Sequence, residues 1–420
     1  MNSANTIWDK FIGGTFRFFV ACGLLFASAA IPTLAVDPLL DPKPAVVSKL
    51  KALQPNRGVR LGNASILGDF NATARQYDLH KTGPRGRDFT IKMCWAQDRK
   101  RVLYCGANHA VPHRINDVWE FDLPSLTWFM LYAPDLPRGY TDLGKDQSDV
   151  EFKNGILITK RGGPAIIAHT WWGLTYDPQR QSLLFMNTWV TKKQDAVAKL
   201  GGDPAKLYKG PPLWGFSPGE RKWKPFKSPK PYPKAIFGGM LEYIPDLGGS
   251  IWHTNNWQMR STWLHDFQKD TWRNLDANSG GKAFENESPE PEQIGYYDPK
   301  RKIMVVHRHF STHHYDPNKN KWTKVWAGNK EDGRTPYGHD ARSVFYHDPA
   351  SGHGLLVQFQ TNTLWAYNPD DHAWIKLAPQ GEPMPNGGKR LAYVDPAMNV
   401  LVVIDKTEVW AYRYRSNPRR

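Results

Sequence analysis

The sequence has few cysteines and lacks the short motifs that mark several large enzyme classes. Only 3 of its 420 residues are cysteine, which is too few for a fold held together by disulfides. It contains no Walker phosphate loop, no dinucleotide-binding fingerprint after a strand, and no paired C-x-x-C motif. These absences argue against a P-loop nucleotide hydrolase, a Rossmann-type oxidoreductase and a cysteine-rich zinc module.

Acidic residues are in the minority. The chain has 40 Asp and Glu residues against 55 Lys and Arg, which gives a formal net charge of +15 at pH 7. A surface of this charge attracts polyanions such as nucleic acid, anionic lipid or acidic polysaccharide. No run of like charge is long enough for a nucleic-acid-binding tail. The cellular compartment therefore has to decide among these partners.

The only long apolar run lies within residues 1–35. Lys10 and Arg17 precede or open an apolar stretch that ends in small residues just before Val36, as in a secretory signal peptide. Pro32 interrupts the run, which is short for a membrane span. We expect a periplasmic or secreted protein without a transmembrane segment after cleavage, although an uncleaved anchor stays open. For an exported protein, acidic polysaccharide is the favoured partner and nucleic acid is not expected; the oligomeric state is not indicated.

The two cysteines beyond the leader, Cys94 and Cys105, flank a predicted hairpin turn at residues 97–101. Residues that face each other across a hairpin can be close enough to form a disulfide. Export would permit that bond. Two buried free thiols are the alternative, and the sequence does not choose between them.

What the sequence has in abundance is a repeat. Pairs of Trp nine residues apart recur along the chain, and one copy carries His in place of the first Trp. The pairs are Trp119 and Trp128, Trp214 and Trp223, Trp263 and Trp272, His313 and Trp322, and Trp365 and Trp374, and a last copy begins at Trp410. Most copies are about 50 residues apart, and each is preceded by two short apolar runs. Four short strands per repeat predict an all-β propeller of four-stranded blades.

The repeat also sets the expected domains. We expect residues 87–420 to form a propeller of six or seven blades, with two insertions between Trp119 and Trp214. The last copy ends at the C-terminus without its outer strand. We expect residues 36–86 to be a linker that contributes this missing strand and closes the ring.

An aromatic residue separated from Trp by six residues, as in Phe121 and Trp128 or Tyr367 and Trp374, resembles the kelch repeat. The resemblance implies a propeller but says little of function, because one fold hosts many activities. Kelch repeats usually carry two glycines after the second strand. Here those places hold polar or charged residues such as His253-Thr254 and His307-Arg308.

Polar side chains at these places form the predicted site. Both the start of the first strand and the end of the second strand of a blade lie on one face of a propeller. The residues expected on this rim are Asn108, His109, His169, His253, His307, His309 and His339. The alternative for each histidine is a satisfied role in a loop or in the core.

The first functional hypothesis is β-elimination on an acidic polysaccharide. This reaction needs a cation for the substrate carboxylate, a base for the adjacent proton and an acid for the leaving oxygen. The arrangement is similar to that of propeller polysaccharide lyases, such as those acting on ulvan, which use His, Tyr and Arg at the propeller centre. This resemblance implies His169, Tyr243 and Arg260 as catalytic residues, and His109 is a further catalytic candidate because of its place on the rim. For Tyr243, packing in its strand is the alternative.

Two further hypotheses stay open. The first is a glycan- or protein-binding module without turnover. Trp171 and Trp172 would stack on sugar rings, with Asn108, His253, Arg308 and His339 as further contacts. The second is a metal site. His307 and His309 alternate along a strand end and could bind zinc or another divalent metal.

Overall fold

The computed structural model describes residues 40–68, 83–106, 116–135, 149–165, 167, 169–186, 193–211, 213–234, 238–256, 259–275, 284, 287 and 292–415. The predicted leader, residues 1–35, lies outside this part of the chain. Within it, no helix combines the length and the apolar character needed to cross a membrane.

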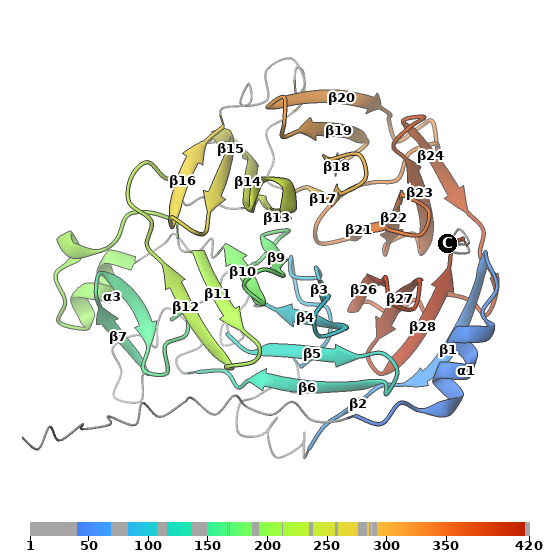
Figure 1. Ribbon diagram of the computed structural model, residues 1–420, viewed down its shortest axis with the longest axis horizontal. Coiled ribbons are helices and arrows are strands. Elements are labelled where there is room, and N and C mark those ends of the chain that lie inside the picture. The colour runs from blue at the N-terminus through green and yellow to red at the C-terminus, as the bar shows by residue number, and fades with distance from the viewer. Residues whose placement is uncertain are drawn as a thin grey trace, which may run out of the picture. The chain divides into compact units, whose positions relative to one another are not determined.

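The described residues form a six-bladed β-propeller, which settles the blade count left open by the sequence (Figure 1). Each blade is an antiparallel sheet whose four strands follow one another from the centre outward, apart from the closing strand of the last blade. Blade one consists of β3 (Cys94–Ala96), β4 (Arg101–Cys105), β5 (Val118–Asp122) and β6 (Thr127–Tyr132). Blade two consists of β9 (Leu174–Asp177), β10 (Ser182–Met186), β11 (Leu213–Ser217) and β12 (Lys222–Phe226). Blade three consists of β13 (Met240–Ile244), β14 (Gly249–Asn256), β15 (Met259–Asp266) and β16 (Thr271–Asn274).

The remaining blades follow the same order. Blade four consists of β17 (Ile294–Asp298), β18 (Ile303–Arg308), β19 (Ser311–Asp316) and β20 (Lys321–Ala327). Blade five consists of β21 (Ser343–Asp348), β22 (His353–Gln358), β23 (Thr363–Asn368) and β24 (Ala373–Leu377). Blade six consists of β26 (Arg390–Asp395), β27 (Val400–Asp405), β28 (Glu408–Arg413) and β1 (Arg57–Asn63). Two short strands, β2 (Ser65–Ile66) and β25 (Gln380–Gly381), extend the outer edges of blades one and six.

The repeated aromatic pair explains the spacing seen in the sequence. The ring of Trp128 in β6 lies 4.9 Å from that of Phe121 in β5, and the rings of Tyr367 and Trp374 lie 5.0 Å apart. Each pair is directly cross-strand between the third and fourth strands of its blade. Cross-strand aromatic pairs of this kind stabilise the sheet and bury a large apolar area. One local contact, repeated, thus produces the period of about 50 residues.

The N-terminal segment closes the ring where the sequence predicted a ring-closing strand. Strand β1 pairs antiparallel with β28 and supplies the outer strand of the sixth blade. Gly58 fits there because an added Cβ would lie 2.3 Å from the indole Cζ2 of Trp410. Helix α1 (Pro44–Ala52) is tied to the same blade, since the guanidinium of Arg413 donates to the carbonyl of Leu50 at 2.8 Å. Among the inner strands, β26 also contacts β3.

All six inner strands run in the same direction along the propeller axis, so the propeller has two distinct ends. We call the end formed by residues that precede the inner strands the strand-start mouth, and the opposite end the strand-end mouth. Each mouth holds a cavity. The inner strands β3, β9, β13, β17, β21 and β26 lie nearest the centre of Figure 1.

The register of the first hairpin decides the question about the cysteines. Cys94 in β3 pairs with Leu103, whereas Cys105 lies two residues further along β4 and pairs with Val118 of β5. The two thiols are buried and free. Because they are not directly opposite each other, the free-thiol alternative describes this structure.

The first predicted insertion contains the hairpin of β7 (Val150–Lys153) and β8 (Ile156–Thr159). The second contains helix α3 (Lys193–Lys199) and a short 3-10 turn, Pro204–Lys206. These elements share a small core of their own with Val150, Leu157, Ala165, Ala196 and Val197. A second 3-10 turn, Pro245–Leu247, follows β13.

Candidate functional site

The strand-start mouth holds a cavity of about 420 Å³. Its walls come from the segments that lead into β3, β21 and β26, together with the turn after β22. The side chains that define its chemistry are Arg87, Asp88, Phe89, Arg342, Phe359, Lys389 and Arg390. Four of these are basic and one is acidic, so the lining carries positive charge.

Two of the predicted histidines meet at Phe89, on the wall of this cavity. The Phe89 ring is stacked on His169 at 4.9 Å and lies 6.0 Å from the ring of His339. Trp171 packs edge-on against His169 at 5.0 Å. These four residues, which we call the Phe89 cluster, bring together segments that lead into blades one, two and five.

The backbone of the Phe89 cluster is strained. Phe89 has φ +51° and Trp171 has φ +44°, and the Trp171 amide donates to the Phe89 carbonyl at 2.8 Å. Left-handed backbone is a clear outlier for large residues such as these. It costs on the order of 1–3 kcal/mol and often accompanies functional sites. The fold therefore holds these two rings in place against a local preference.

The aromatic cluster continues toward blade four. Tyr337 stacks near His339 at 5.8 Å, and His309 stacks on Tyr337 at 5.2 Å. Burial, with the nearby charges of Arg342 and His309, lowers the pKa of His339 to about 4. His339 is therefore neutral at pH 7.

The positive charge of this mouth is only partly compensated. The buried guanidinium of Arg87 pairs with Asp117 at 2.6 Å, and the amine of Lys389 pairs with Asp88 at 2.6 Å. For Arg390 and the exposed Arg342, the described residues include no carboxylate within ion-pair distance. The buried Arg390 instead donates to the Pro385 carbonyl at 2.8 Å, to the Phe359 carbonyl and to Asn362. The exposed guanidinium of Arg342 is therefore the group that can meet an anion from solution.

Two other predicted residues, His253 and Arg260, belong to a separate cluster around Phe284. The ring of Phe284 lies 5.7 Å from His253 and 4.9 Å from the Arg260 guanidinium. His253 is fully buried; its Nδ1 is 3.0 Å from Thr262 Oγ1, and burial lowers its pKa to about 3. His253 therefore has a core role, which was the alternative reading of the sequence.

Arg308 lies beside this second cluster and is already engaged. Its Nη1 is 3.4 Å from the Glu287 carboxylate, which also contacts His313 at 3.1 Å and Lys324 at 2.7 Å. Burial alone would raise the pKa of Glu287, but the hydrogen bonds and charges of His313 and Lys324 hold it at about 2. Arg308 thus faces an ionised internal carboxylate.

The predicted metal pair, His307 and His309, is split by the backbone. The His307 side chain is buried, with Nδ1 3.0 Å from Thr312 Oγ1 and Nε2 3.0 Å from the Pro336 carbonyl. Both ring nitrogens are occupied. His309 follows the end of β18 with φ +49°, which breaks the alternation that would have put both rings on one side. No group of three or more potential metal-ligating side chains occurs among the described residues, so these two residues do not fit a metal site.

Tyr243 and Trp172 also lie elsewhere than predicted. Tyr243 lines the cavity of the strand-end mouth because it lies near the end of its inner strand. Trp172 is buried between inner strands, with its indole donating to the Gly295 carbonyl at 2.6 Å. The set proposed for catalysis is therefore distributed over both mouths and the Phe284 cluster. Asn108 and His109 lie outside the described residues.

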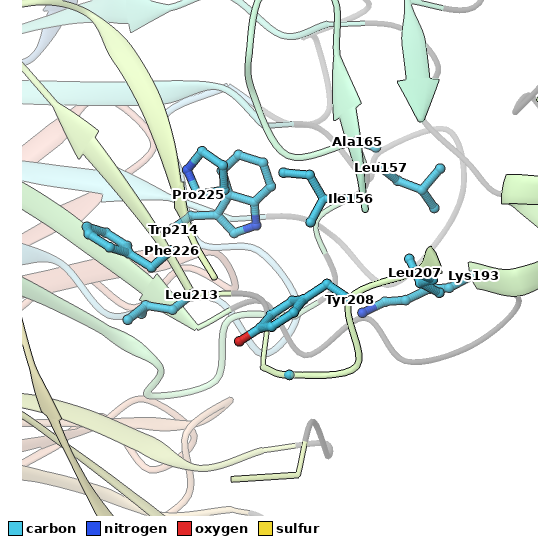
Figure 2. Close-up of a pocket in the computed structure, with 11 residues that line it drawn as sticks. Ile156, Leu157, Ala165, Lys193, Leu207, Tyr208, Leu213, Trp214, Pro225 and Phe226 are labelled. Carbon is cyan, nitrogen blue, oxygen red and sulfur yellow. The ribbon is translucent and has the colours of Figure 1, made fainter. Parts of the chain in front are cut away.

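A third cavity lies between the insertions and blade two (Figure 2). Lys193, Tyr208 and Trp214 are among its lining residues, and burial lowers the pKa of Lys193 to about 8. The space is only about 40 Å³, enough for one or two water molecules. We interpret it as a packing seam.

Sequence reasoning missed the residues that give the strand-start mouth its charge. Arg342 and Lys389 both lie in segments that precede inner strands: Arg342 is three residues after His339, and Lys389 is four residues after Pro385. Histidine recurs at equivalent positions in two blades, at His169 and His339, whereas basic residues, 55 in all, are too common in this chain to single out two of them. Phe89 precedes β3 without any periodic signal.

No protein-family model matches this sequence, and no curated protein matches it. The kelch resemblance is therefore not confirmed by a family match. Among solved structures, TolB from Acinetobacter baumannii is 14% identical over 72% of this chain, with a TM-score of 0.37, and the chain spans 56% of that protein's length.

Two further solved structures are similar at the same level. An auxiliary nutrient binding protein from Bacteroides ovatus is 8% identical, with 78% of this chain and 69% of that chain covered and a TM-score of 0.45. The extracellular domain of BT4673, a one component system from B. thetaiotaomicron, is 10% identical, with 80% and 39% covered and a TM-score of 0.40. These scores are too low to carry a functional argument.

Proposed function

We propose that this protein is an exported propeller that binds acidic polysaccharide at its strand-start mouth. The observation that supports this most directly is the cavity of about 420 Å³ with the exposed guanidinium of Arg342 on its wall. A guanidinium matches the two oxygens of a uronate carboxylate. The ring of Phe89 offers an apolar surface beside it for the sugar. Export rests on the leader-like residues 1–35, and the choice of an acidic partner rests also on the net charge of +15.

The test is a calorimetric titration of the protein with uronate-containing oligosaccharides. We expect saturable binding that weakens as salt is raised, because the attraction is partly electrostatic. Neutral oligosaccharides of the same length should bind more weakly at this mouth.

Arg342→Ala should weaken the binding about tenfold, the value of one charge-assisted hydrogen bond. The matched control is Arg334→Ala, because Arg334 is also exposed but does not line the cavity. Equal losses in the two variants would show a diffuse charge effect and would overturn the proposed site, as would the absence of binding across the panel.

Lysis by β-elimination is the second candidate function. It is favoured by one observation, namely that the His169 and His339 rings both contact Phe89 beside the cavity. In this scheme Arg342 neutralises the carboxylate and neutral His339 takes the proton on the adjacent carbon. The electron pair forms a C=C bond, and the C–O bond to the leaving sugar breaks. The leaving oxygen takes a proton from solvent water, and His339 returns the proton it took to solvent.

Absorbance of the unsaturated sugar during incubation with uronate-containing glycans tests this scheme. We expect His339→Gln to abolish the signal while calorimetric binding persists. Binding without any unsaturated product would leave the glycan-binding function and exclude the lyase.

A further inference from the structure

The strand-end mouth holds a larger cavity, of about 580 Å³, that the proposed glycan site does not use. Every blade contributes to it through the last residues of its inner strand. These residues are Trp95, Tyr176, Tyr243, Tyr297, His347 and Val394. In five blades this residue stands two places before a proline that also lines the cavity. The repeat thus builds a mostly aromatic funnel.

Two rim tyrosines are held by neighbouring blades. The Tyr176 hydroxyl donates to Asp98 at 2.5 Å, and the Tyr297 hydroxyl donates to Asp246. Both acceptors lie in turns that follow the inner strand of the preceding blade. The rings are therefore fixed before any ligand arrives, which lowers the entropic cost of binding.

The floor of the funnel is polar but carries no net charge. Lys92 forms an ion pair with Glu242, donates to the Leu241 carbonyl at 3.2 Å and lies 5.0 Å over the ring of Trp172. Lys92 and Glu242 are the only Lys, Arg, Asp or Glu side chains in the described lining. Their charges cancel, and burial lowers the pKa of His347 to about 4, so it is neutral at pH 7. A charged ligand would lose its hydration here without gaining a partner.

One hydroxyl in the wall has no partner. Tyr296 is 4% exposed, and its Oη is buried without a hydrogen bond to any described residue. Buried hydroxyls are normally satisfied, and leaving one unpaired is costly. The Glu242 carboxylate, on the same cavity, has a side chain that is still 13% exposed. The Tyr296 hydroxyl is buried between blades four and five, where its ring packs on Phe345. Glu242 is therefore the acidic group that faces this space lined mainly by aromatic rings and prolines.

We propose that the strand-end mouth binds an uncharged saccharide of one or two rings. The C–H faces of such a sugar pack on Tyr243 and its neighbours, while one of its hydroxyls donates to the Glu242 carboxylate. Cavities of about 300–1,000 Å³ that combine aromatic walls with a few polar groups are typical small-molecule sites. The proposal does not depend on the acidic-glycan site, because the two cavities lie at opposite ends of the inner strands and share no lining residue.

The test is calorimetric titration of the full chain with glucose, galactose, mannose, cellobiose, maltose and lactose. We expect at least one of them to bind saturably, with little dependence on salt. Tyr243→Ala should weaken this binding about fivefold to tenfold by removing a wall of the funnel.

The matched control is Arg342→Ala at the other mouth, which should leave neutral-sugar binding unchanged and affect only uronate binding. Thermal unfolding of each variant shows whether it is folded, and Tyr243→Leu, which keeps the bulk but removes the flat ring, takes the place of Tyr243→Ala if that variant does not fold. Absence of binding by all six sugars would overturn the proposal. So would sugar binding that Tyr243→Ala leaves intact, or that Arg342→Ala abolishes.

Discussion

The indole of Trp172 donates a 2.6 Å hydrogen bond to the carbonyl of Gly295. Trp172 leads into the second blade and Gly295 lies in the inner strand of the fourth, so this contact joins two blades that are not neighbours. The same ring carries Lys92 over its face and lies 5.6 Å from Tyr346. One side chain therefore connects segments from four blades around the propeller axis, between the two mouths.

We predict that Trp172 is among the residues on which stability depends most. Trp172→Phe should cost about 1–2 kcal/mol, because it removes the hydrogen bond and leaves the Gly295 carbonyl unpaired. Trp172→Ala should cost about 3–5 kcal/mol, the usual range for a large buried side chain. Urea unfolding measures both. Trp326→Phe is the control, since it removes a 2.7 Å indole bond to Thr335 in a half-buried place on an outer strand. An equal or larger loss in the control would contradict this assignment.

Closure of the ring by β1 can be tested at Gly58. A Cβ at this position would meet the Trp410 ring at 2.3 Å, so Gly58→Ala has to push the closing strand away from the sixth blade. We expect a loss of about 1–3 kcal/mol, as for other overpacked sites, and a lower midpoint in thermal unfolding. Gly219→Ala is the matched control because nothing lies within 4 Å of the added carbon. If the two variants unfolded alike, β1 would not be a stabilising part of the ring.

The two buried thiols should be chemically silent in the folded protein. Burial raises the pKa of Cys94 to about 12, and burial also raises that of Cys105, so neither is a thiolate at pH 8. A chromogenic thiol reagent should therefore label both only after unfolding in denaturant. A reducing agent should leave the unfolding midpoint unchanged. A drop in the midpoint on reduction would mean that a disulfide forms in solution.

The buried histidines predict sensitivity to acid. Burial lowers the pKa of His253 and of His307 to about 3, from an ordinary 6.5. Below pH 6.5 the unfolded chain binds protons at these positions while the native protein does not. Their contribution to stability is thus present above pH 6.5 and is lost as pH falls toward 3, by about 1.4 kcal/mol per pH unit for each histidine.

Urea unfolding between pH 7 and pH 4 measures this slope. His307→Gln should make the free energy of unfolding depend less steeply on pH, by the contribution of one histidine. The variant should also be less stable than the wild type at pH 7, because Gln does not reproduce both hydrogen bonds. Gln268→Ala is the control, since Gln268 is exposed and does not titrate, and it should leave the slope as it is in the wild type. An unchanged slope in His307→Gln would show that His307 is protonated in the native state.

The architecture could be read from the chain because its cause is local. A pair such as Tyr367 and Trp374 brings two adjacent strands together across one turn, so its spacing is written directly into the sequence. The closing strand could also be anticipated, because the last repeat stops after VWAYRY and leaves an open edge. The choice between six and seven blades could not be predicted, because the segment between Trp119 and Trp214 is long enough to contain a seventh blade.

The candidate site was harder to predict because spacing places a residue at an end of a strand but does not direct its side chain. His307 and His309 are two residues apart, yet the left-handed backbone at His309 separates their rings. His253 sits at the expected strand end but turns into the core. Tyr243 follows His169 in the order expected, yet it lies at the opposite mouth because an inner strand runs between the two positions.

By itself, the sequence determined the repeating blade, since each blade is specified by aromatic contacts between residues close in the chain. The tertiary structure alone decided which side chains share a mouth, because Phe89, His169 and His339 come from three blades and meet only once the ring is closed. The physical reason is that residues distant in the chain are brought together by the curvature and closure of the ring, and no local periodicity encodes that geometry.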